Sequence, residues 1–124
     1  MHELSVTQSL LDMVISEAKK VGASSIEKIN IVVGELTGIV DESVQFYFEI
    51  ISVGTLAEGA TLSFKYVPAE FYCGTCGHTY NRNSFSFKCP KCGSTGVMTK
   101  KGNELYIENI EVVFDGDKSL KEHT

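Results

Sequence analysis

The chain has no long hydrophobic run, and this absence excludes a membrane-spanning helix. A bilayer span needs roughly 18 to 20 consecutive apolar residues, and no stretch of the 124 residues reaches that length. The first ten residues, MHELSVTQSL, also lack the basic flank and the apolar stretch of a secretory signal peptide. We therefore expect a soluble, cytoplasmic protein that does not associate with a membrane.

The residue patterns of common catalytic sites are absent as well. The sequence has no Ser-His-Asp set, no glycine-rich phosphate-binding loop and no cysteine outside two short pairs that would serve as a nucleophile. We therefore expect that the protein is not an enzyme. A length of 124 residues with 43% hydrophobic and 22% charged positions fits either one compact unit or a core that carries a small appended module.

A positive charge excess is also lacking, which argues against nucleic acid as the partner. Eleven Lys and Arg residues against sixteen Asp and Glu residues give a net charge of −5. The charge is nevertheless unevenly distributed, because residues 71–103 contain five basic residues and no acidic one. The remainder of the chain carries six basic and all sixteen acidic residues. This asymmetry predicts two modules of opposite charge.

Hydrophobic spacing predicts two helices and three strands. Apolar residues recur at helical spacing over residues 4–21 and 41–53, and Asp41 is the expected N-cap of the second helix. Alternating apolar and β-branched residues over 27–36, 61–67 and 104–114 predict strands. Phe46 and Ile50 widen the apolar stripe of the second helix, so we expect this helix to be largely covered.

The most specific motif is a doubled cysteine pair. All four cysteines lie in two pairs with twelve residues between them: Cys73 with Cys76, and Cys89 with Cys92. Two residues between thiols allow a tight turn to point both sulfur atoms at one centre, and Gly77 and Gly93 supply unusual backbone angles after each turn. Two such turns make a tetrahedron of thiolates, which favours a structural Zn²⁺ with a closed coordination shell.

Other interpretations of the cysteines stay open. Disulfide-linked or metal-free pairs are disfavoured in a cytosolic chain with this pairing. The two motifs, each followed by glycine, also resemble the iron-binding turns of rubredoxins, and ligand chemistry alone does not separate iron from zinc. His78 lies two residues after Cys76, where it would replace a thiolate, donate a hydrogen bond near the metal, or be an exposed loop histidine.

These elements together predict an α+β fold with an inserted zinc-ribbon-like module. Two helices pack on one face of a three-stranded sheet, and the module lies between the second and third strands. The predicted parts are an α+β domain of residues 1–69 plus 103–114, a zinc-binding module of residues 70–102, and a flexible tail of residues 115–124. The strands that flank the insertion are expected to be adjacent and antiparallel, because the chain leaves and returns at the same place.

The amino terminus offers a second set of metal ligands. The free α-amine of Met1, the deprotonated amide nitrogen of His2 and the His2 imidazole Nδ1 would close two fused chelate rings on one ion. Glu3 or another group would supply the fourth donor of a square plane, which suits Ni(II) or Cu(II). A chance histidine near a chain terminus is the alternative that the spacing alone leaves open.

Several segments in combination resemble the HypA/HybF nickel metallochaperones of hydrogenase maturation. The resemblance spans nearly residues 1–114. It rests on the opening Met1-His2-Glu3-Leu4-Ser5 and on the paired cysteines after Phe71. It also rests on the stretch Val33-Gly34-Glu35-Leu36, which leads to Val44, Phe46 and Phe48. The second cysteine pair is followed here by Gly93 and Ser94, whereas some relatives carry a histidine beside both pairs. Any sensing of pH by flanking histidines therefore depends on His78 alone.

The resemblance implies a function and assigns the sites. It implies that His2, with the Met1 amine and Glu3, binds nickel as cargo, and that Cys73, Cys76, Cys89 and Cys92 bind structural zinc. It further implies delivery of Ni(II), with a HypB-type maturation GTPase, to the large subunit of a [NiFe]-hydrogenase, and in some family members to urease. A zinc-ribbon adaptor for protein or nucleic acid and a rubredoxin-like electron carrier are the alternatives. The sequence leaves the oligomeric state open, a homodimer included.

Overall fold

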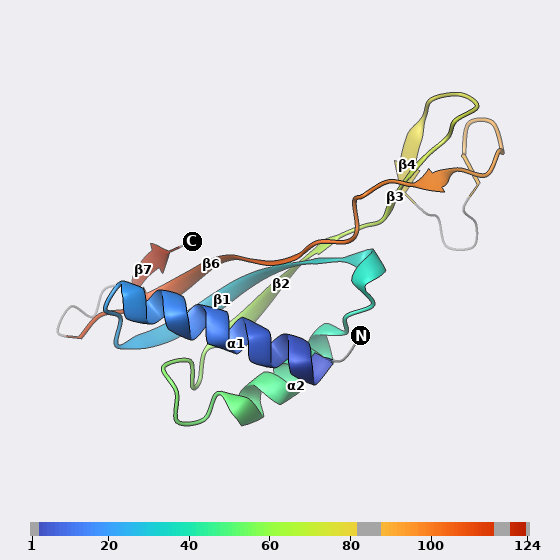
Figure 1. Cartoon of the computed structure of the whole chain (residues 1–124). Coiled ribbons are helices and arrows are strands. Elements are labelled where there is room, and N and C mark those ends of the chain that lie inside the picture. Colours follow the sequence, from blue (N-terminus) through green and yellow to red (C-terminus); the bar gives the residue numbers. More distant parts are fainter. Residues whose placement is uncertain (1–2, 82–87, 116–119, 124) are drawn as a thin grey trace. The chain divides into compact units, whose positions relative to one another are not determined.

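The computed structural model describes residues 3–81, 88–115 and 120–123. Both predicted helices and all three predicted strands are present, with ends within two residues of the predicted ones. Figure 1 shows the elements, which in chain order are α1 (Glu3–Lys20), β1 (Ser25–Gly34), the 3₁₀ helix η1 (Glu35–Thr37), α2 (Asp41–Ile51), β2 (Thr61–Val67), β3 (Glu70–Tyr72), β4 (Thr79–Asn81), β5 (Val97–Met98), β6 (Leu105–Val113) and β7 (Leu120–His123).

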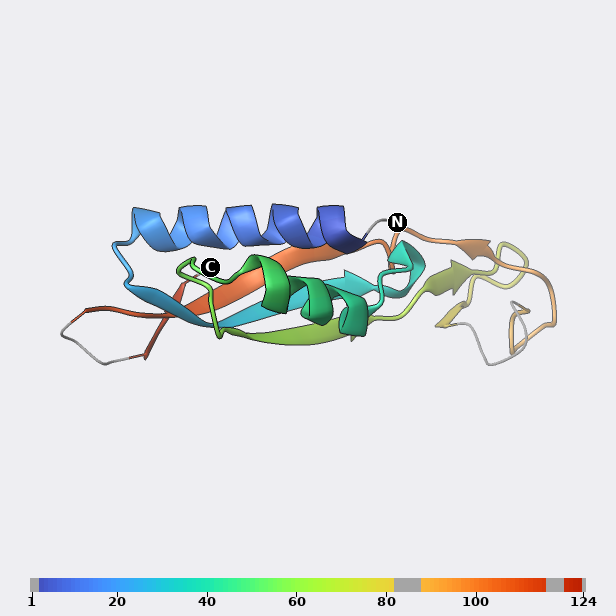
Figure 2. The ribbon, with the colours of Figure 1, turned by 90° about the horizontal axis from the view of Figure 1, so that it is seen from below.

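The main sheet has the strand order β2-β1-β6-β7, so β1 separates the two strands that flank the insertion. The prediction that β2 and β6 are adjacent is therefore wrong. β1 and β6 are antiparallel, because Ser24 N–H donates to the Val113 carbonyl at 2.8 Å while Gly34 N–H donates to the Glu104 carbonyl at 2.7 Å. β1 and β2 run in the same direction (Figure 2). Residues 31–34 of β1 are all buried, which fits a strand with a neighbouring strand on each side.

The helices cover one face of this sheet, as the sequence predicted. α1 packs against α2, and both lie on the same side of the strands (Figure 2). The core between helices and sheet is built from fully buried aliphatic side chains, among them Val14 and Ala18 of α1, Val44 of α2, and Val112 of β6. No helix in the described part of the chain is long and apolar enough to cross a membrane.

α2 differs from its prediction at its start and on its outer face. Val40 is the N-cap residue and Asp41 is the first helical residue, with its carboxylate accepting from the Glu42 N–H at 3.0 Å. Phe46 and Ile50 are 60% and 57% exposed, so the expectation that the helix is largely covered is wrong. Val44 and Phe48 are the buried residues of α2, so only the face of the helix that carries them meets the core.

The carboxyl-terminal segment adds a strand that the sequence did not predict. Residues 115–124 were expected to form a flexible tail, but Leu120–His123 form β7 and pair antiparallel with β6. The sheet therefore has four strands rather than three. The low apolar content of this segment gave no strand signal, whereas pairing at the free edge of β6 uses backbone groups and needs no apolar side chain.

The chain divides into two compact units. The first contains residues 1–32, 39–65 and 106–124, and the second contains residues 33–38 and 66–105. The predicted module covers residues 70–102. The second unit contains these residues and, in addition, residues 33–38, 66–69 and 103–105. The second unit has its own antiparallel sheet of order β4-β3-β5, in which Phe71 lies opposite Tyr80 on one side and Met98 on the other.

Within the second unit, residues 34–36 hold the chain on both sides of the insertion, and we call them the 34–36 brace. The Glu35 carboxylate accepts a hydrogen bond from the Ala69 N–H at 2.8 Å, just before β3. The Leu36 N–H donates to the Gly102 carbonyl at 2.7 Å, just before β6. Gly34 and Gly102 approach so closely that a side chain on Gly34 would overlap the Gly102 backbone.

Replacement of Gly34 with alanine should therefore destabilise the protein. The added methyl group would overlap the Gly102 carbonyl and lie 2.7 Å from the Asn103 nitrogen, and backbone atoms cannot rotate away from it. We expect a loss of about 1–3 kcal/mol in the free energy of unfolding, measured by chemical denaturation. Gly74→Ala is the matched control, because a methyl group there meets nothing within 4 Å. Equal denaturation midpoints for the two variants would contradict this account of Gly34.

Candidate metal centre

Each cysteine pair lies on a turn with the same backbone hydrogen bonds. In both turns the N–H of the first cysteine donates to the carbonyl five residues later, and its own carbonyl accepts from the N–H four residues later. The bonds are Cys73 to His78 at 2.9 Å, Gly77 to Cys73 at 2.8 Å, Cys89 to Ser94 at 2.8 Å and Gly93 to Cys89 at 2.8 Å. Gly77 and Gly93 have φ angles of 77° and 78°, which explains glycine after each pair.

The two turns bring all four sulfur atoms to one place. The four Sγ atoms lie within 4.8 Å of one another, with Cys73 to Cys92 at 3.4 Å and Cys76 to Cys89 at 3.6 Å. Four sulfurs arranged tetrahedrally about 2.3 Å from a zinc ion would be about 3.8 Å apart. The cluster therefore fits one thiolate-bound ion, and it is the only group of three or more metal-ligating side chains among the described residues.

Two of the four thiols have pKa values shifted in opposite directions by their surroundings. The Ser94 backbone N–H, aided by the Ser94 hydroxyl and the Cys73 thiol, lowers the pKa of Cys92 to about 6. The His78 N–H lowers the pKa of Cys76, but desolvation and hydrogen bonds from the other three thiols outweigh it and raise the pKa to about 11. Four thiolates at this spacing repel one another, so full ionisation requires a cation among them.

The first cysteine of each pair belongs to a small apolar core. Cys73 and Cys89 are buried, whereas Cys76 and Cys92 are exposed. The same cluster contains Ala69, Phe71 and Tyr80, and the rings of Phe71 and Tyr80 stack with their centroids 5.7 Å apart. Two of the five members are thus metal-ligand candidates, so the candidate metal site and this apolar core share residues.

His78 lies beside the cysteines but outside the sulfur cluster. It is partly buried, and its ring stacks on Tyr80 with centroids 6.1 Å apart. This packing contact is none of the three roles that the sequence left open for His78. Arg82 of the basic stretch is outside the described residues.

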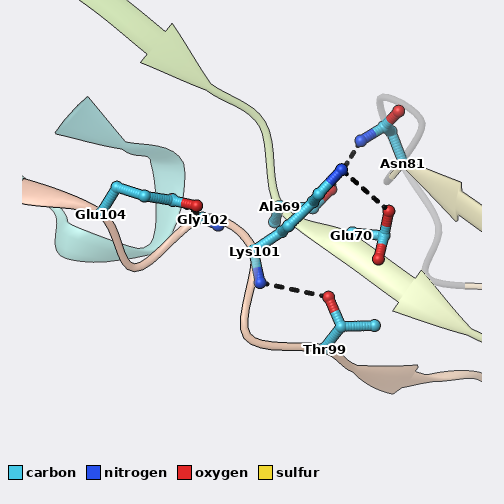
Figure 3. Close-up of polar contacts among 7 residues, drawn as sticks. All are labelled: Ala69, Glu70, Asn81, Thr99, Lys101, Gly102 and Glu104. Atoms are coloured by element: carbon cyan, nitrogen blue, oxygen red, sulfur yellow. Dashed lines mark hydrogen bonds and ion pairs between the residues drawn. The ribbon is translucent and has the colours of Figure 1, made fainter. Parts of the chain in front are cut away.

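Polar contacts near the two ends of the insertion, at residues 69–70 and 101–104, were not predicted from the sequence. Figure 3 shows the Lys101 ammonium 3.7 Å from the Glu70 carboxylate and the Asn81 amide donating to the Ala69 carbonyl at 2.9 Å. The Gly102 N–H donates to the Glu104 carboxylate at 2.8 Å. Glu70 and Glu104 lie just outside the basic stretch 71–103, so its positive charge is bounded by carboxylates at both ends.

Of the predicted nickel ligands, the structure places Glu3 alone. Met1 and His2 are outside the described residues, and Glu3 is the first residue of α1. Its carboxylate accepts from the Val40 N–H at 3.4 Å, and its carbonyl accepts from the Thr7 hydroxyl at 2.5 Å. A carboxylate in the first turn of a helix interacts favourably with the positive end of the helix dipole.

The sequence is similar to known proteins over most of its length. Residues 1–112 match the family model described as "Hydrogenase/urease nickel incorporation, metallochaperone, hypA". The hydrogenase maturation factor HypA of Caldanaerobacter subterraneus subsp. tengcongensis is 55% identical over 113 residues, which cover 90% of this chain and 99% of that protein. The same factor from Dehalococcoides mccartyi is 46% identical over 112 residues, which cover 90% of this chain and 94% of that protein.

Two solved structures of HypA proteins are also similar to this chain. The solution structure of the Ni metallochaperone HypA from Helicobacter pylori is similar with a TM-score of 0.61 at 28% identity, and the match covers 93% of this chain and 100% of that chain. A second solution structure of a HypA protein gives a TM-score of 0.65 at 28% identity, covering 91% of this chain and 97% of that one. The resemblance drawn from the sequence is confirmed: the chain belongs to the HypA family of nickel-incorporation metallochaperones, which are not enzymes.

Proposed function

We propose that this protein binds Ni(II) at its amino terminus and delivers it in the cytoplasm to the large subunit of a [NiFe]-hydrogenase, while its four cysteines hold a resident zinc ion. The observation that carries the proposal is the family match over residues 1–112, which includes both the Met1-His2-Glu3 opening and the cysteine cluster. A HypB-type GTPase is the proposed partner in delivery. Urease is a second recipient in the proposal, because the matched family is named for both enzymes.

The proposed nickel ligands are the Met1 amine, the His2 amide nitrogen and imidazole, and the Glu3 carboxylate. Three nitrogens in fused chelate rings favour a square-planar ion such as Ni(II) over a tetrahedral one such as Zn²⁺. The long hydrogen bond of 3.4 Å between Val40 and the Glu3 carboxylate leaves that carboxylate with further lone pairs for an ion. The two proposed metal sites share no ligand, so the cargo leaves without disturbing the resident ion.

Zinc is the proposed resident ion because four thiolates in a closed shell suit a structural role. With four protein ligands the ion has no open position for substrate, and Cys73, Cys76, Cys89 and Cys92 supply all four. The rubredoxin-like alternative predicts a red protein with one iron. The zinc-ribbon adaptor predicts one zinc and no nickel. Metal analysis with and without added Ni(II) separates these three functions.

Removal of zinc should unfold the second unit and leave the helices in place. The small core around Phe71 and Tyr80 includes Cys73 and Cys89, so the metal should supply much of this unit's folding free energy. We expect chelation, or Cys89→Ala, to make residues 71–101 sensitive to protease while helical circular dichroism is kept. Lys91→Ala is the control, because Lys91 is exposed between the ligands of the second pair. Unchanged protease resistance after zinc removal would refute the prediction.

Nickel binding should depend on His2 and on a free α-amine. We expect His2→Ala to abolish Ni(II) binding to the zinc-loaded, untagged protein while zinc content and fold stay unchanged, because no ligand is shared. Calorimetric titration measures the affinity. His78→Ala is the matched control, because His78 stacks on Tyr80 outside the proposed nickel ligands.

A second arm of the same titration uses an extension of a few residues before Met1. The extension converts the amine into an amide, which is a much poorer donor until it loses its proton, so nickel affinity should fall. The same extension placed after Thr124 should leave the affinity unchanged. Equal affinities for the untagged protein, the amino-terminal extension and His2→Ala would end the amino-terminal hypothesis.

A further inference from the structure

The outer face of α2 carries a row of exposed apolar side chains. Phe46, Ile50 and Val53 are 60%, 57% and 65% exposed. Phe46 and Ile50 are four residues apart and lie on one side of α2, and Val53 follows in the turn after the helix ends at Ile51. A contiguous row of large apolar side chains in water is a feature of interaction sites rather than of ordinary monomer surfaces.

Two adjoining cavities lie between α2 and the edge strand β2 of the first unit. The first has a volume of about 420 Å³ and an apolar lining of Phe46, Leu62 and Phe64. The second has a volume of about 610 Å³ and includes Phe48 and Val53 in its lining. Gln45 and Glu49 line both cavities, so the two adjoin each other along α2. We call them together the α2–β2 groove.

The polar lining of the groove is acidic. Asp41, Glu42 and Glu49 line the first cavity, and Glu49 and Glu58 line the second. Among the residues that the structure describes, neither cavity is lined by lysine or arginine. The nearest lysine along β2, Lys65, lies 3.9 Å from the Glu108 carboxylate and is not part of the lining. The groove therefore combines an apolar floor with an acidic rim.

We propose that the α2–β2 groove binds a cationic amphipathic helix of a partner protein. The apolar side chains of that helix would lie against Phe46, Leu62 and Phe64, and its lysine or arginine residues would meet the carboxylates of Glu42 and Glu49. α2 has eleven residues and is about 16 Å long, which sets the docked segment at about three helical turns.

Charge selects this occupant over others. A second copy that used the same groove in a two-fold dimer would bring two acidic rims together. Nucleic acid and anionic lipid carry the same sign of charge as the rim. The proposal rests on residues 41–64 alone and does not depend on nickel binding at the amino terminus.

The test uses a synthetic, fluorescently labelled helical peptide with leucines at helical spacing flanked by lysines. Its anisotropy is followed during titration with the zinc-loaded full chain. We expect binding that weakens with added salt, and that weakens about tenfold or more in Phe46→Ser, because Phe46 lines the groove. The double variant Glu42→Gln with Glu49→Gln should flatten the salt dependence. Amide NMR shifts on peptide addition should cluster in residues 41–64.

The matched control is on α1, where Met13 is 53% exposed and Asp12 is an exposed neighbour. Met13→Ser with Asp12→Asn should leave peptide affinity unchanged. A peptide with glutamate in place of lysine should bind at least tenfold more weakly than the lysine peptide. Equal binding of the two peptides, or wild-type affinity in a folded Phe46→Ser variant, would overturn the proposal.

Self-association provides a further arm that tests the competing occupant. Light scattering over a range of protein concentrations measures the oligomeric state of the wild type and of Phe46→Ser. A dimer that Phe46→Ser abolishes would assign the groove to a second copy and overturn the proposal. Nickel titration of the same variant separates the two hypotheses, because Phe46→Ser should bind Ni(II) as the wild type does.

Discussion

Four sulfur atoms within 4.8 Å of one another impose the constraint on which the second unit depends. Four thiolates at this spacing repel one another. Without an ion the thiols differ, because the Ser94 N–H lowers the pKa of Cys92, whereas desolvation and hydrogen bonds from the other thiols raise the pKa of Cys76. A divalent cation offsets the repulsion and converts two separate turns into one cross-linked unit. The repeated backbone hydrogen bonds and the two left-handed glycines hold the turns so that their sulfur atoms converge.

The first unit has a different source of stability. Its core of aliphatic side chains between two helices and a four-stranded sheet contains no metal ligand candidate among the buried residues, so the unit folds by burial of apolar surface. This division suits a carrier, because a resident ion and a cargo ion have opposite requirements. The proposed resident ion must stay bound, and a closed shell of four thiolates would hold it. The proposed cargo site must release its ion. Its proposed ligands are not part of the main core, so the ion would leave without unfolding of the first unit.

The sequence predicted what depends on local pattern and missed what depends on long-range pairing. Helical spacing and strand alternation located α1, α2, β1, β2 and β6 within two residues, and the paired cysteines indicated the sulfur cluster. The central place of β1, the edge strand β7 and the 34–36 brace follow from backbone hydrogen bonds between distant segments. Phe46 was misjudged because an apolar stripe shows which residues are suited to burial, not whether a second layer covers them.

X-ray absorption spectroscopy at the nickel edge of the zinc-loaded, untagged protein with one equivalent of Ni(II) tests the central claim most directly. The account predicts four-coordinate planar nickel surrounded by nitrogen and oxygen, with the outer scattering of one imidazole and no sulfur ligand. The zinc edge of the same sample should show four sulfur ligands, with and without nickel. Sulfur in the nickel shell, or loss of sulfur from the zinc shell when nickel binds, would contradict the separation of cargo and resident ion.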